Sequence, residues 1–139
     1  MGNPVIIDTG PLIALLNGRD QRHTWAKSQI DLITDPLMTC EAVLSEVFFI
    51  LRNNVPGGEE SLCKMIDRGI LMSEFCFKEH SHRVLEILQK YRDLPTSFAD
   101  ACLVCMVENL NKAKIFTLDR DFKIYRKHNR QIIPLLYPN

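Results

Sequence analysis

The stretch VIIDTGPLIALL, residues 5–16, decides the fold. It places three branched apolar residues before an aspartate, with a Thr-Gly-Pro turn and a second apolar run behind it. The branched residues predict a short buried strand, and Pro11 is typical of the first turn of a helix. Asp8 therefore stands where the strand ends and the helix begins. An aspartate there can cap the helix by accepting backbone hydrogen bonds, or it can face a ligand at the edge of a sheet.

The same alternation of strand and helix continues to the end of the chain. Strands are predicted at 4–8, 36–39, 70–77, 113–119 and 131–137, and helices at 10–18, 21–34, 40–53, 58–69, 78–91, 97–110 and 120–128. This order predicts an α/β protein whose parallel sheet is covered by helices on both faces. Strand C-terminal ends and helix N-terminal ends then share one edge, where ligands bind. With no repeats or linkers, we expect one domain over residues 1–139.

The composition is that of a globular protein with its own core, since 46% of the 139 residues are hydrophobic and 24% are charged. No apolar run approaches the roughly 18 residues needed to cross a bilayer. The N-terminus enters a strand without an export signal. We therefore expect a cytoplasmic protein with no membrane segment.

Cysteine and charge patterns add two weaker expectations. The five cysteines are scattered, which argues against a disulfide framework, and Cys102 and Cys105 fall in an apolar helix where core packing is expected. The formal net charge is zero, but residues 112–130 hold seven Lys or Arg against two acids. This basic segment is compatible with a polyanionic partner or with a solvated helix face.

Several acids occupy unusual positions in this pattern. Asp119 ends the strand 113–119 as Asp8 ends the first strand, and Asp121 follows in the next turn. Asp100 is the single charged residue in an otherwise apolar stretch of helix, which is typical of a helix enclosed in the core. Glu46 falls, on a helical wheel, inside the apolar arc of its helix. Burying a lone carboxylate costs several kcal/mol unless its charge is compensated.

Each acid also has a structural explanation. Asp8 and Asp119 can cap the helices that follow them. Asp100 stands three residues after Ser97, the spacing of a capping box. Glu46 can form a buried salt bridge with an arginine.

One joint interpretation accounts for all four acids. If they converge on one pocket, their charges repel strongly, and some stay protonated unless a cation compensates them. Ligands that offer only oxygen suit Mg²⁺ or Mn²⁺ better than zinc or copper. A cation of this kind polarises phosphoryl oxygens and lowers the pKa of bound water. The acids therefore predict metal-dependent phosphoryl chemistry.

Four segments, VIIDTGPLIALL, TCEAVLSEVFFIL, LPTSFADACLV and FTLDRDF, resemble in this order the PIN-domain family. The resemblance is greatest to the VapC-type toxins of bacterial and archaeal toxin–antitoxin pairs. It implies a three-layer sandwich with a five-stranded parallel sheet and a Mg²⁺- or Mn²⁺-dependent endoribonuclease that leaves 5′-phosphate and 3′-hydroxyl ends. It also implies a homodimer, silenced by a small antitoxin protein whose tail fills the groove.

The resemblance also assigns roles to individual residues. The family's catalytic and metal-binding quartet falls on Asp8, Glu46, Asp100 and Asp119, and the accessory positions fall on Asp121, Thr9 and Ser97. Contacts with the RNA backbone are a separate conjecture from the basic side chains, Arg92, Arg120, Lys123 and Arg126.

Four other functions are alternatives to that of a toxin. A stand-alone PIN-domain RNA-processing nuclease shares every motif, and a PIN-like module that binds RNA or a partner without cutting would be marked by a lost acid. A receiver-type phosphoacceptor needs an acidic pair near its first strand and a lysine after its last, and this chain has neither. A dehalogenase-like phosphatase needs a second aspartate where Gly10 stands.

Overall fold

Strand β1 (Val5–Ile7) occupies the centre of a five-stranded parallel sheet in the computed structural model, which describes residues 2–139. The strand order is β3-β2-β1-β4-β7, and every neighbouring pair is parallel. The other four strands are β2 (Leu37–Met38), β3 (Leu71–Met72), β4 (Lys114–Phe116) and β7 (Leu135–Leu136). The predicted α/β class and five-stranded sheet are confirmed.

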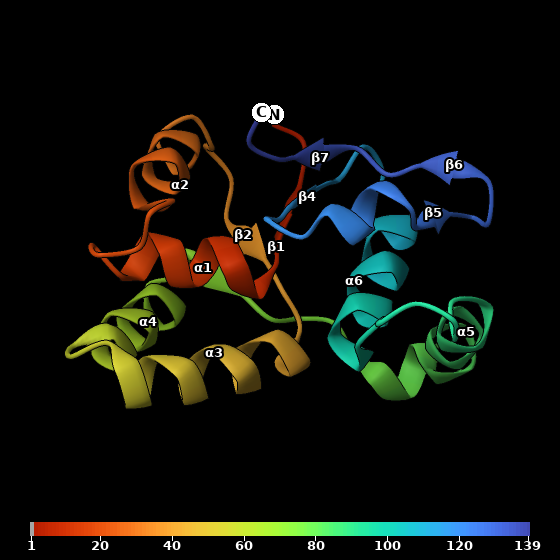
Figure 1. Ribbon diagram of the computed structural model, residues 1–139, viewed down its shortest axis with the longest axis horizontal. Helices are drawn as coiled ribbons and strands as arrows, with labels where there is room; N and C mark the ends of the chain where they lie inside the picture. The colour runs from red at the N-terminus through yellow and green to blue at the C-terminus, as the bar shows by residue number, and fades with distance from the viewer. Residues whose placement is uncertain (1) are drawn as a thin grey trace.

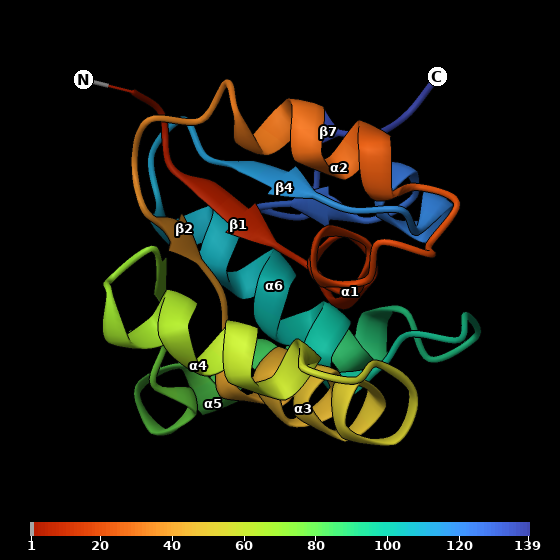
Figure 2. The same ribbon diagram turned by 90° about the vertical axis from the view of Figure 1, so that its left-hand side faces the viewer.

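Helices cover both faces of this sheet and give three layers. The six α-helices are α1 (Thr9–Leu16), α2 (His23–Ile30), α3 (Glu41–Asn54), α4 (Gly58–Asp67), α5 (Phe77–Lys90) and α6 (Phe98–Asn109). Figure 1 shows α1, α2 and α4 on one side of the sheet and α5 and α6 on the other, and Figure 2 gives the view turned by 90°. None of the helices within residues 2–139 is long and apolar enough to cross a membrane.

The core forms on both faces of β1 and β4. Ile6, Ile7 and Phe116 are fully buried, and the Trp25 ring of α2 packs edge-on against Phe116 with 5.3 Å between the centroids. On the opposite face, α6 is buried from its second to its tenth residue. Its buried residues include both cysteines of the C-x-x-C pair, as expected for core packing.

The chain beyond β4 differs from its prediction in two places. The helix expected over 120–128 is a short 3₁₀ helix, η1 (Arg120–Lys123), followed by strand β5 (Arg126–Lys127). The strand expected over 131–137 is interrupted by Ile133 and Pro134 and divides into β6 (Gln131–Ile132) and β7. β5 and β6 form a separate antiparallel hairpin, while β7 takes the edge position predicted from its proline.

Several other elements are shorter than predicted, and two of them differ most. The strand expected over 70–77 keeps only the two residues of β3, because Cys76 caps α5 and Phe77 is already helical. The helix expected over 21–34 begins at His23 and ends at Ile30. In both cases the apolar pattern continued past the end of the regular backbone.

Candidate functional site

The C-terminal ends of β1 and β4 place three acids at one edge of the sheet. Ile7 and Phe116 are paired in register, so the residues that follow them lie side by side. Asp8 directly follows β1, and Asp100 stands in the first turn of α6. The strand expected over 113–119 ends at Phe116, so Asp119 lies three residues beyond β4, where it caps η1. A cleft of about 420 Å³ opens between them, lined by Asp8, Thr9, Gly10, Glu46, Pro95, Ser97, Ala99, Asp100, Leu118 and Asp119.

Asp8 is a buried carboxylate with a hydrogen bond on each oxygen. Its side chain is the N-cap of α1, with Oδ1 accepting the Thr9 N–H at 2.7 Å, and Oδ2 accepts the Thr117 hydroxyl at 2.8 Å. Burial raises the pKa of Asp8 to about 6, and the charges of Asp100 and Asp119 add to this effect. The two hydrogen bonds oppose it only in part. Asp8 is therefore held in a setting that disfavours its ionised form unless a cation is close.

Asp100 serves the helix and the cleft at once. It forms the predicted capping box, in which Ser97 Oγ accepts the Asp100 N–H at 3.0 Å and Asp100 Oδ2 accepts the Ser97 N–H at 3.3 Å. The same Oδ2 accepts the Tyr125 hydroxyl at 3.0 Å. Burial raises the pKa of Asp100, while the hydrogen bonds from Ser97 and Tyr125 lower it in part. The capping box predicted for Asp100 is confirmed, and the same residue lines the cleft.

Asp119 is half-buried and caps η1, with Oδ1 accepting the Asp121 N–H at 2.9 Å. Its own backbone N–H donates to Thr117 Oγ1 at 2.9 Å. Thr117 is fully buried and thereby links the two strand-end acids, because its hydroxyl also donates to Asp8. Sequence reasoning missed Thr117, since a threonine inside a strand is common and its partner is 109 positions away.

We expect Thr117→Val to destabilise the protein by about 1–3 kcal/mol, because the buried Asp8 carboxylate loses a donor and the Asp119 N–H loses an acceptor. It should also weaken divalent-cation binding. Urea unfolding and calorimetric titration with Mn²⁺ measure the two effects.

Thr39→Val is the matched control. Thr39 is also fully buried, but its hydroxyl donates to the backbone carbonyl of Ile7 and not to a carboxylate. The Thr39→Val variant should be less stable than the parent and should bind Mn²⁺ with the parent's affinity. Equal Mn²⁺ affinities for the two variants would exclude a role for Thr117 in holding the acids.

Glu46 lies on the rim of the cleft, and the prediction that it is buried is wrong. Its side chain is exposed, and Phe49, its neighbour on the predicted apolar arc, is 72% exposed. The core stripe of α3 is narrower than the arc and consists of Val43, Val47 and Leu51. Within residues 2–139 no basic side chain forms an ion pair with Glu46. Its place in the cleft lining is the remaining structural link to the other acids.

The other predicted residues separate into two groups. Thr9 and Ser97 line the cleft, whereas Asp121 stands beside it, with its N–H bound to Asp119. The four basic residues predicted to contact RNA do not line the cleft. They are Arg92, Arg120, Lys123 and Arg126. Arg126 donates to the backbone carbonyls of Lys123, Ile124 and Tyr125 at 2.7–3.1 Å. Its guanidinium therefore closes the turn after η1.

The donor set of the cleft fits a hard divalent cation. Four carboxylates and two hydroxyl residues offer oxygen ligands, from Asp8, Glu46, Asp100, Asp119, Thr9 and Ser97. Two of these carboxylates have raised pKa values that a bound cation would lower. Among the described residues, however, no three acidic, histidine or cysteine side chains are grouped closely enough to form a ready metal site.

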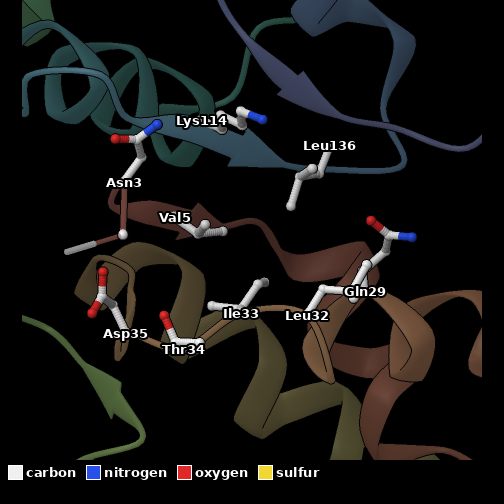
Figure 3. A pocket seen from close by; sticks show the side chains of 10 residues that line it. Asn3, Val5, Gln29, Leu32, Ile33, Thr34, Asp35, Lys114 and Leu136 are labelled. Atoms are coloured by element: carbon white, nitrogen blue, oxygen red, sulfur yellow. The ribbon is translucent and has the colours of Figure 1, made fainter.

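A second cavity lies at the opposite end of the sheet and has different chemistry. It measures about 320 Å³ and is lined by Val5 and Lys114, which begin β1 and β4. Figure 3 shows the labelled polar groups of this cavity, with Asp35 as its one carboxylate. It lacks converging acids and does not compete with the cleft as a metal site.

Comparisons with known proteins agree with this architecture. A family model for the PIN domain matches residues 5–127. VapC20 from Mycobacterium tuberculosis, a toxin that cleaves the sarcin–ricin loop, is similar in structure with a TM-score of 0.76 and 21% sequence identity. The similarity covers 86% of this chain and 93% of that chain. Among curated proteins, none matches this sequence at a significant level.

Proposed function

Because this chain belongs to the PIN-domain family, we propose that it is a Mg²⁺- or Mn²⁺-dependent endoribonuclease that hydrolyses RNA phosphodiester bonds. The observation that carries the proposal is the cleft at the C-terminal edge of the sheet. There, two buried carboxylates, Asp8 and Asp100, face the same space as Asp119 and Glu46. Buried acids with raised pKa values in a cleft are typical of functional sites.

In this function each residue of the cleft has a distinct task. Asp8, Asp100 and Asp119 would hold the cation through carboxylate oxygens, with Glu46 completing the set from the rim. A bound divalent cation supplies Lewis-acid polarisation of the phosphoryl group and a water of lowered pKa. The N-termini of α1 and α6 point their partial positive charge at the same edge, which favours a phosphodiester there. Thr117 and Tyr125 would keep the carboxylates in place.

We further propose that the chain is the toxin of a toxin–antitoxin pair acting in the cytoplasm. The structural similarity to VapC20 supports this, as do the four motifs that resemble VapC-type toxins. By the same resemblance, a small antitoxin would fill the cleft, and the toxin would form a homodimer. Co-expression with the product of the adjacent reading frame tests for the antitoxin. Light scattering after size-exclusion chromatography tests for the homodimer. A stand-alone RNA-processing nuclease would be active without any such partner.

Millimolar Mn²⁺ or Mg²⁺ should raise the melting temperature by several degrees relative to chelator. Binding to the folded state alone stabilises it by about 2.7 kcal/mol when the cation is at about 100 times its Kd. The cation should stabilise most above pH 6, where Asp8 is ionised. Scanning calorimetry with and without Mn²⁺ measures the shift, and an unchanged transition would contradict a cation site in the cleft.

Analysis of the cleavage products tests the reaction itself. Cut RNA should carry 5′-phosphate and 3′-hydroxyl ends and should not appear in chelator. A chain that binds RNA and Mn²⁺ but leaves the RNA uncut would instead be a PIN-like binding module.

A further inference from the structure

We propose that Tyr125 is a positioning residue for the cation site, where its buried hydroxyl fixes one oxygen of Asp100 and leaves the other for the ion. The inference rests on the proposed function and adds a residue that belongs to neither the acidic quartet nor its accessory positions. It begins from a direct contact between the Tyr125 hydroxyl and Asp100 Oδ2, 3.0 Å long.

The contact distinguishes the two oxygens of the Asp100 carboxylate. Oδ2 accepts both the Tyr125 hydroxyl and the Ser97 N–H. In the part of the chain that the structure describes, no donor is bonded to Oδ1. Because a carboxylate is planar, two donors on one oxygen set the direction in which the other oxygen offers its lone pairs. Asp100 thus reaches the cleft with one oxygen restrained and one available.

Tyr125 is itself held from several sides and cannot follow Asp100 if that side chain turns. The tyrosine is fully buried, its ring packs against Phe122 and Tyr91 with centroids 5.1 and 5.0 Å away, and its N–H donates to the Asp121 carbonyl at 3.1 Å. A buried phenol hydroxyl needs a hydrogen-bond partner. Asp100 is the acceptor that this hydroxyl has.

The hydrogen bond between Tyr125 and Asp100 also connects two segments that carry proposed metal ligands. The segment that leaves β4 carries Asp119 and Asp121, folds through η1, and returns at Tyr125 to touch the first turn of α6. One hydrogen bond therefore ties the segment of one proposed ligand, Asp119, to the side chain of another, Asp100. Groups that orient metal ligands in this way typically change metal affinity by 10- to 100-fold when they are removed.

Tyr125→Phe removes the hydroxyl and keeps the ring. We expect it to weaken Mn²⁺ binding about tenfold by calorimetric titration, and to reduce the rise in melting temperature that Mn²⁺ produces. RNA cleavage should require proportionally more Mn²⁺ for half of its maximal rate and approach the parent rate when the ion is saturating.

Tyr91→Phe is the matched control. Tyr91 belongs to the same aromatic cluster, but its hydroxyl accepts the Arg126 N–H at 2.9 Å and touches no acid. This variant should lose stability comparably and bind Mn²⁺ like the parent. Parent-like Mn²⁺ affinity in Tyr125→Phe would overturn the positioning role and leave the nuclease proposal standing. A parent protein that neither binds Mn²⁺ nor cuts RNA would overturn the proposed function itself, and this inference with it.

Discussion

Asp8→Asn is expected to reduce RNA cleavage about a thousandfold while making the cation-free protein more stable. In the proposed mechanism the loss of activity follows because asparagine cannot supply the negative charge that would hold the cation, and a thousandfold loss corresponds to about 4 kcal/mol of transition-state stabilisation. The gain in stability follows because the neutral amide removes a buried charge that the fold does not compensate. The two effects have opposite signs, which separates a site residue from a structural cap, whose loss costs about 1 kcal/mol.

The stability gained by Asp8→Asn should depend on pH. The pKa of Asp8 rises from 3.8 to about 6 on folding, so the folded state holds the proton more tightly than the unfolded state. The associated stabilisation is complete below pH 3.8 and is lost as the pH rises through 6. Above that pH the ionised side chain costs up to about 3 kcal/mol. Asp8→Asn should therefore resemble the parent at pH 4 and exceed it at pH 7.

Urea unfolding at these two pH values, together with cleavage assays in Mn²⁺, measures both effects. Asp20→Asn is a suitable control, because Asp20 accepts the Arg22 N–H in a turn outside the cleft. It should change neither cleavage nor the pH profile. If Asp8→Asn cuts RNA at the parent rate, the assignment of this acid to the site is wrong.

Arg83→Met should destabilise the protein by about 2–4 kcal/mol, because it leaves the carboxylate of Glu108 buried without its counterion. The side chain of Glu108 is 6% exposed, and Arg83 donates to its carboxylate from Nε at 2.8 Å and from Nη2 at 2.7 Å. Its Oε2 also accepts the His128 N–H at 2.6 Å. By comparison, Arg52→Met breaks an exposed pair with Glu59 and should cost less than about 1 kcal/mol.

The effect should again depend on pH. Burial by itself raises the pKa of Glu108, but the hydrogen bonds from Arg83 and His128 outweigh it and leave the pKa below its ordinary value of 4.5. The parent therefore holds this stabilisation above pH 4.5 and loses it as the pH falls further. In Arg83→Met the burial remains without the guanidinium, so the variant should approach the parent in acid. Thermal unfolding between pH 4 and 8 measures this, and the double variant with Glu108→Gln should recover most of the loss.

The strand-end acids were predictable from the sequence because a local pattern determines their place. Asp8 and Asp119 each follow a short apolar strand, and in a parallel sheet such ends share one edge. Asp100 was predictable for a similar reason, since the Ser97 spacing fixed it to the first turn of α6. For these three acids, position in the chain was enough to predict position in the fold.

The environment of Glu46 was not predictable in the same way. The helical wheel identified an apolar arc on this helix. Such an arc shows which positions share apolar side chains, but it does not show which of those side chains are buried in the core. On α3 the fully buried side chains are those of Val43, Val47 and Leu51, and Phe49 faces outward. The contacts of Thr117 and Tyr125 could not be predicted from the sequence for another reason. Each is a hydrogen bond to a partner that is distant in sequence and comes close only in the folded chain.

The central strand pairs with two strands that are made at very different times. β1 (Val5–Ile7) leaves the ribosome long before β4, its neighbour in the finished sheet, which begins at Lys114. Contacts between such distant segments form only after both are available. A nascent chain therefore carries Asp8 and Asp100 without the strand that brings Asp119 beside them. If the protein cuts RNA as proposed, the nascent chain should be inactive until β4 and Asp119 have been translated and have paired with β1.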